Sequence, residues 1–144
     1  MSNAAEQALL DLLFLNTDWA NVGDAAGLQN SATAGSFYIA LHTADPDEAG
    51  SQTTSEAAYT SYARVAVARS AGGWTRTGSS IANTALVQFP QCTGSSSTIT
   101  HFSVGTDSSG AGQIIVSGAL SSSLAVSTGI QPQFAAGELS TTAD

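Results

Sequence analysis

The side chains best suited to chemistry gather in one short stretch of the chain. His42 ends an apolar segment, and Asp45, Asp47 and Glu48 follow it closely. Together with His101 these groups could hold zinc, and the carboxylates alone could bind calcium. Zinc sites need closed ligand spacing, which two distant histidines do not provide, and the carboxylates lack the spacing of a calcium loop. We therefore predict a solvated turn, with calcium binding or catalysis as alternatives.

Nucleophilic chemistry has little support in this sequence. Serine is so abundant that a Ser-His-Asp triad cannot be identified, and no G-x-S-x-G segment is present. Neither a P-loop nor a G-x-G-x-x-G segment before a helix occurs. Cys92 is the single cysteine, which excludes an intrachain disulfide and suits a small buried side chain. The sequence thus predicts no catalytic, cofactor-binding or metal-binding residue and a protein that is not an enzyme; a small hydrolase is the alternative.

The charge balance excludes several classes of partner. Only 10% of the residues are charged, lysine is absent, and three arginines face eleven carboxylates, so the formal net charge is −8. A nucleic-acid interface needs cations to neutralise phosphates, and an acidic membrane surface would repel this chain. Since no apolar run is long enough to span a membrane and no secretory signal is recognisable, we expect assembly in the cytoplasm.

The scarce arginines are candidates for an interface. Arg64 and Arg69 lie on opposite faces of a predicted strand by parity. One of them could pair with an acidic group of a partner. The alternative is a set of local surface ion pairs, each worth at most about 1 kcal/mol.

A helix is predicted over residues 3–15. Ser2 or Asn3 can cap it, and Glu6 suits its first turn, where the helix dipole favours an anion. Its leucines and phenylalanine cover most of its circumference, which predicts burial in its own domain or against another chain. The candidate partner-docking residues are therefore Leu9, Leu12, Leu13, Phe14, Arg64 and Arg69.

Residues 16–36 lack a clear period and read as a long connection, whereas strand-like alternation begins at Phe37. Phe37, Ile39 and Leu41 are predicted on one strand face, opposite His42. Further strands are expected over 62–69, 81–90, 98–104, 113–120, 123–126 and 130–140, with a hairpin anchored by Trp74. Seven or more short strands predict a mainly β fold, an antiparallel β-sandwich or jelly-roll-like domain with a short N-terminal helix. We assign residues 1–36 to the helix and connecting arm and residues 37–144 to the β domain.

Several motifs occur in the order found in one family. They are YIALHTADP at 38–46, SYARVAV at 61–67, FP at 89–90, THFSVG at 100–105, SGAL at 117–120 and PQFAAGEL at 132–139. With these motifs the chain resembles small virion structural proteins of tailed bacteriophages, a family often labelled phage tail fibre protein. The resemblance covers most of residues 37–139 and leaves residues 16–36 outside.

The resemblance implies a non-enzymatic component of the virion with no catalytic residues to carry over. Small β proteins of phages often decorate the head as trimers, whereas a fibre usually has a long shaft. We therefore expect a head decoration (cement) protein that binds the major capsid protein as a homotrimer, without cofactor, nucleic acid or membrane. The alternative is a tail fibre or tail-associated protein that contacts the host surface. In that case sugars could stack on the aromatic residues Trp19, Trp74, Tyr38, Tyr59 and Tyr62.

Overall fold

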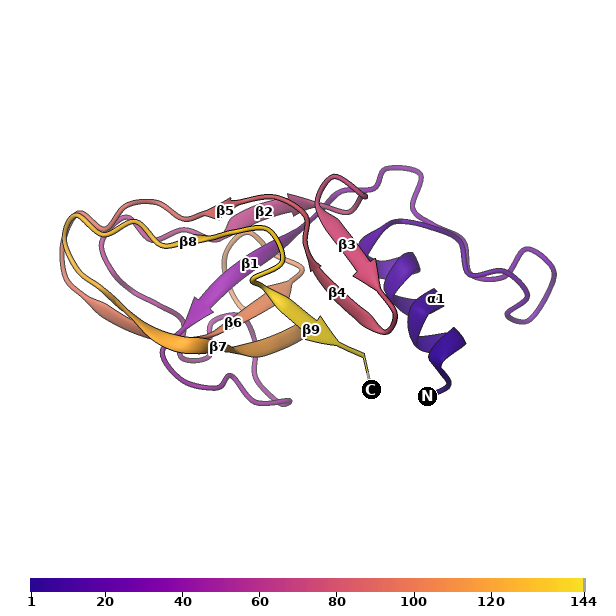
Figure 1. Ribbon diagram of the computed structural model, residues 1–144, viewed down its shortest axis with the longest axis horizontal. Helices are drawn as coiled ribbons and strands as arrows, with labels where there is room; N and C mark the ends of the chain where they lie inside the picture. The colour runs from indigo at the N-terminus through magenta and orange to yellow at the C-terminus, as the bar shows by residue number, and fades with distance from the viewer. Residues whose placement is uncertain (144) are drawn as a thin grey trace.

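The computed structural model describes residues 1–143, and its fold is mainly β with antiparallel sheets, as predicted (Figure 1). One helix and nine strands are assigned within these residues. In chain order they are α1 (Asn3–Phe14), β1 (Ser36–His42), β2 (Val65–Ala68), β3 (Trp74–Thr77), β4 (Ser80–Asn83), β5 (Val87–Gln88), β6 (Ser97–Gly105), β7 (Ile114–Val126), β8 (Gln133–Phe134) and β9 (Ser140–Thr142). The helix within residues 1–143 is too short to cross a membrane.

The N-terminal helix begins and ends as the sequence predicts. The Ser2 side chain accepts a hydrogen bond from the backbone N–H of Ala5 and caps the first turn, where Glu6 also lies. At the other end the N–H of Leu15 bonds the carbonyl of Asp11. Figure 1 shows α1 beside the β3–β4 hairpin.

The largest sheet has the strand order β2-β1-β6-β7, and all of its pairings are antiparallel. On β1 the side chains of Phe37, Ile39 and Leu41 face the core, as their parity predicts. The opposite face is also covered at the end of β1, because the loop of residues 43–64 folds back over it and leaves His42 0% exposed. Because of this loop, β1 is buried on both faces at its His42 end.

Strict alternation along the predicted strand at 98–104 would place Ile99 on the face opposite Phe102, and on β6 this is wrong. Both side chains lie in the core, because the pairing of β6 with β7 is irregular between Ile99 and His101. The same irregularity lets β7 run unbroken over 114–126, where two strands were predicted. A bulge adds an unpaired residue to one strand, so the side chains beyond it point to the other face of the sheet. The amino-acid composition of the strand gives no sign of this shift.

Two smaller sheets, β3-β4-β9 and β5-β8, complete the fold. The predicted hairpin is present as β3 and β4, which pair Thr77 with Ser80 across a turn that contains Gly78 at φ +60°. The predicted strand over 81–90 is divided between β4 and β5.

The hydrophobic core joins the sheets to the helix. Trp74 is 2% exposed and anchors the hairpin, as expected. Phe14 at the end of α1 packs its ring 4.9 Å from that of Trp74 and 5.1 Å from that of Phe37. Residues of β5 and β8, Val87 and Phe134, belong to the same cluster. The division into an arm at 1–36 and a domain at 37–144 stays a prediction.

Candidate functional site

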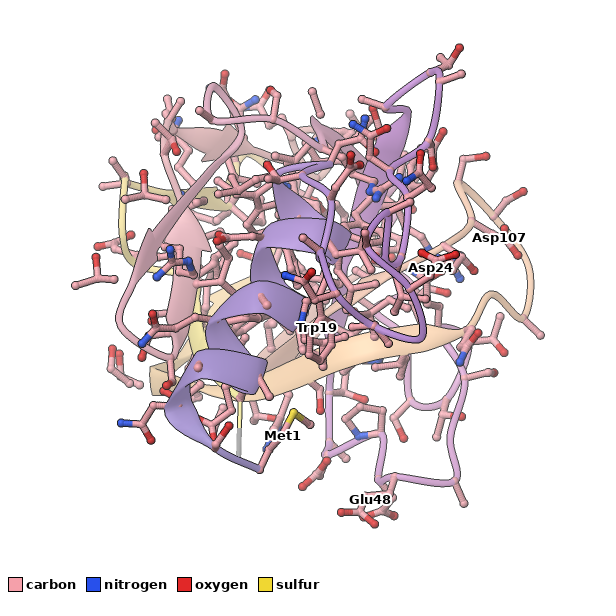
Figure 2. All side chains as sticks on the ribbon, turned by 90° about the vertical axis from the view of Figure 1, so that its right-hand side faces the viewer. Met1, Trp19, Asp24, Glu48 and Asp107 are labelled. Atoms are coloured by element: carbon pink, nitrogen blue, oxygen red, sulfur yellow. The ribbon has the colours of Figure 1, made fainter. Side chains whose placement is uncertain are left out.

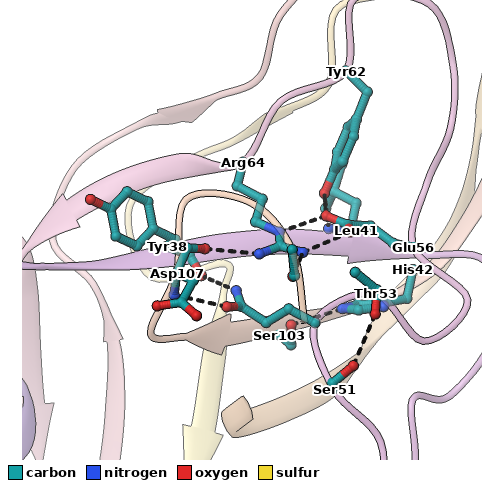
Figure 3. A network of polar contacts seen from close by, with 12 residues as sticks. Tyr38, Leu41, His42, Ser51, Thr53, Glu56, Tyr62, Arg64, Ser103 and Asp107 are labelled. Carbon is teal, nitrogen blue, oxygen red and sulfur yellow. Dashed lines mark hydrogen bonds and ion pairs between the residues drawn. The ribbon is translucent and has the colours of Figure 1, made fainter. Parts of the chain in front are cut away.

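A network of polar contacts lies where the loop of residues 43–64 meets β1 and the turn before β7 (Figure 3). Its centre is the ion pair of Arg64 and Glu56. The guanidinium donates from Nε and Nη2 to the two carboxylate oxygens, at 2.7 and 2.8 Å. It also donates to the backbone carbonyls of Asp107 and Gly110, at 2.9 and 2.7 Å. Since the Arg64 side chain is only 2% exposed, this arginine is a structural cation that joins three segments of the chain.

Two further side chains extend this network. The Tyr62 hydroxyl donates to Glu56 at 3.0 Å and accepts the N–H of Leu41 at 3.0 Å. Burial raises the pKa of Tyr62, and the hydrogen bond from Arg64 to Glu56 raises the pKa of Arg64. Gln52, 0% exposed, donates to the carbonyl of Tyr38 at 3.1 Å and accepts the N–H of Asp107 at 3.0 Å. These groups satisfy one another, as buried polar groups must.

A histidine and a serine meet in the interior. The imidazole of His42 has Nδ1 2.8 Å from the carbonyl of Thr54 and Nε2 2.8 Å from the hydroxyl of Ser103. Because a carbonyl can only accept, Nδ1 carries the proton and Nε2 accepts from Ser103. Burial lowers the pKa of His42, which favours this neutral form. Both side chains are 0% exposed and the third partner is a backbone carbonyl, so the pair is a satisfied element of the core that no substrate reaches.

The two histidines, which are far apart in the sequence, face each other across β1 and β6. His101 Nε2 lies 3.9 Å from the carboxylate of Asp45, and its Nδ1 lies 2.9 Å from the hydroxyl of Thr100. Within the described part of the chain no group of three or more His, Cys, Asp or Glu residues could hold a metal ion. The register of β1 with β6 is what places the two histidines side by side. The sequence does not reveal that these two strands pair.

The carboxylates after His42 lie on an exposed loop. Asp45 is 61% exposed, and its Oδ1 accepts the N–H of Asp47, whose φ is +59°. Asp45, Asp47 and Glu48 line one wall of a groove of about 390 Å³, and the start of β7 forms the other wall. The turn that the sequence predicts is thus exposed, and it also forms one side of this groove. Figure 2 shows Glu48 at the end of this loop, away from Trp19 and Asp24 on the arm.

The candidate docking residues of α1 are divided between the core and its margin. Phe14 is 0% exposed and serves the chain's own core, and Leu13 packs against that core. Leu9 and Leu12 are half-buried. A contact of α1 with a partner therefore stays a prediction, and it rests on Leu9, Leu12 and the margin of Leu13.

Arg69, like Arg64, is bound within the chain. Its guanidinium donates to the carbonyls of Leu12 and Leu13 at the end of α1 and to the carbonyl of Ala34 in the arm. It also lies 5.5 Å from the centre of the Phe37 ring. A cation at a helix C-terminus is favoured by the helix dipole. Parity could not show these partners, because they come from the helix and the arm.

The aromatic residues considered for sugar stacking are largely internal. Trp74 and Tyr59 are each 2% exposed. Burial raises the pKa of Tyr59 to about 12, and the Tyr59 hydroxyl donates to the carbonyl of Pro90. Trp19 is half-buried and forms two backbone hydrogen bonds with Leu28, which close the arm into a loop. Trp74 and Tyr59 are too deeply buried for a sugar ring to stack on them, so the prediction of sugar stacking is wrong for these two residues.

The comparison with protein families agrees with the resemblance of the motifs. A family model described as "Podophage GP4 fiber I protein gp80" matches residues 1–142. The match includes residues 16–36, so the expectation that the arm lies outside the family is wrong. A search of curated proteins found no match. Since the family covers nearly the whole chain, the protein belongs to the podophage fibre I family and is a structural protein of the phage virion.

Proposed function

We propose that this protein is a non-enzymatic fibre component of the phage tail. The observation that carries the proposal is the match of a podophage fibre family over residues 1–142. The buried pair of His42 and Ser103 supports a structural role as well, because its hydroxyl is closed to substrates.

The second candidate is the head decoration protein that binds the major capsid protein. A specific observation favours it. Residues 1–143 form a compact domain whose single helix is short, and this described part contains neither a coiled coil nor a repetitive shaft. The family match outweighs this observation, since a fibre can also be built from short domains.

A homotrimer remains part of either proposal. Small residues such as Ser121, Ser122 and Ser123 are exposed on β7 and allow close approach of a neighbouring copy. Sedimentation equilibrium of the purified protein tests this directly. A monomer at micromolar concentration would count against self-assembly before attachment.

The position on the particle separates the two candidates. An epitope tag at the C-terminus, detected with gold-labelled antibody, should mark the tails of intact particles. Particles that lack the protein should adsorb poorly to host cells while their heads withstand osmotic shock as well as wild-type heads do. Label on the heads, with heads that burst at milder shock, would support decoration and refute the fibre proposal.

A further inference from the structure

The last strand of the four-stranded sheet has an open edge. β7 pairs with β6 on one side only, and no other backbone hydrogen bond within residues 1–143 involves residues 114–126. In an antiparallel strand, alternate residues direct both their N–H and C=O groups away from the paired neighbour. β7 therefore presents a row of free donors and acceptors, and it is the longest edge strand of the fold.

Natural proteins protect such edges with charge, proline, short length or β-bulges, and of these β7 has only the irregularities in its pairing with β6. The other edge of this sheet, β2, has four residues and is flanked by Arg64 and Arg69. β7 has thirteen residues, IIVSGALSSSLAV, with no charged residue and no proline. Its register with β6 is irregular near Ile115 and again between Ala119 and Leu124, so the regular stretches are Val116–Ala119 and Leu124–Val126, of which the first is the longer.

An acidic groove lies against the start of this edge. The groove of about 390 Å³ is lined by Ile114–Ser117 on one side and by Asp45, Asp47 and Glu48 on the other. Consecutive residues of β7 line it, so the groove borders the strand edge as well as one strand face. A segment that pairs with β7 there would place its side chains beside three carboxylates.

The charges indicate what such a segment carries. Each arginine of this chain is already bound within it: Arg64 to Glu56, Arg69 to carbonyls at the end of α1, and Arg76 to Asp11. A second copy would bring another net charge of −8 and no lysine to the groove. The occupant that fits is therefore a different protein with basic residues.

We propose that the β7 edge from Ile114 to Ala119 binds an extended segment of another protein that carries lysine or arginine at alternate positions. The segment adds a strand to the sheet by backbone hydrogen bonds, and its basic side chains on one face lie beside Asp45, Asp47 and Glu48. The inference goes beyond the proposed function and holds for a partner in the tail or in the head.

A lysine-rich peptide tests the proposal. The probe is the synthetic peptide KVKTKVK with blocked ends, titrated into the isotope-labelled protein. Amide resonances of residues 114–119 and of Asp45, Asp47 and Glu48 should shift, and hydrogen exchange of β7 amides should slow. The same peptide with methyl groups on all its central backbone nitrogens keeps its charge but cannot form the ladder, and it should bind at least about tenfold more weakly.

Matched variants separate the groove from the overall charge. Asp45→Asn, Asp47→Asn and Glu48→Gln together should weaken peptide binding about tenfold, at a few tenths of a kcal/mol per exposed pair. Asp18→Asn and Asp24→Asn on the arm, together with Glu6→Gln on α1, make the same change of net charge away from β7 and should weaken binding less than about twofold. Equal weakening by both triple variants, equal binding of the methylated peptide, or shifts away from β7 would each overturn the proposal. So would a dimer of this chain that pairs through β7.

Discussion

We expect the substitution Glu56→Gln to destabilise the fold more than any other loss of a single surface-loop carboxylate. It leaves the Arg64 guanidinium, 2% exposed, without its counter-charge. Breaking a buried ion pair from one side typically costs about 3–5 kcal/mol. Arg64 keeps its two carbonyl acceptors and glutamine keeps one acceptor oxygen, so we expect about 2–3 kcal/mol here.

This loss is measurable by denaturant or thermal unfolding. For a chain of this length it corresponds to a decrease in Tm of about 7–10 °C. The control is Glu48→Gln, the same chemical change on an exposed loop residue, which should stay within about 0.5 kcal/mol of the wild type. Adding Arg64→Met to Glu56→Gln should recover part of the loss, because the unpaired charge is then gone. The reasoning is refuted if Glu56→Gln is as stable as the control or if the double variant is less stable than Glu56→Gln alone.

Three further predictions concern the core and its pH dependence. Phe14→Ala should cost about 3–5 kcal/mol in the free energy of unfolding, and Leu9→Ala clearly less because Leu9 is half-buried; equal losses in urea unfolding would contradict the packing of α1 described here. Burial lowers the pKa of His42 below 6.5, so the unfolded chain takes up a proton that the folded chain does not. Stability should therefore fall as the pH falls from about 6.5 towards the lowered pKa, by at most about 1.4 kcal/mol per pH unit, and the slope should be smaller in His42→Gln when unfolding is measured from pH 7 to 5. Gly105→Ala should lower Tm by several degrees, about 1–3 kcal/mol, since its new methyl group would meet Gln52 and a backbone carbonyl; an unchanged Tm would show that Gln52 moves aside at no cost.

The sequence was sufficient where local patterns determine local structure. Ser2 and the apolar residues after it predict α1, and the alternation of Phe37, Ile39 and Leu41 predicts the core face of β1. The hairpin around Trp74 follows from its flanking glycines and polar residues. In each case the signal and the structure it specifies lie within one turn or one strand.

The remaining features depend on residues that meet only in the folded chain. Glu56 and Gln52 carry no pattern that distinguishes them from other loop residues, yet both are bound to groups brought from other segments. Likewise the pairing of His42 with Ser103 depends on the register of β1 with β6. Irregular pairing on β6 moved Ile99 to the core side, and strand periodicity alone does not predict such irregularities.

The order of the strands has a consequence for how fast this chain folds. β1 is made early but pairs with β6, as in Tyr38 with Gly105, and β4 pairs with β9, as in Ser80 with Thr142. Such pairings give a high contact order, because a long loop must close before either ladder forms. We therefore expect folding in milliseconds to seconds rather than microseconds. During synthesis β4 stays without one neighbour until β9 has left the ribosome, so the nascent chain exposes a strand edge that the folded protein covers.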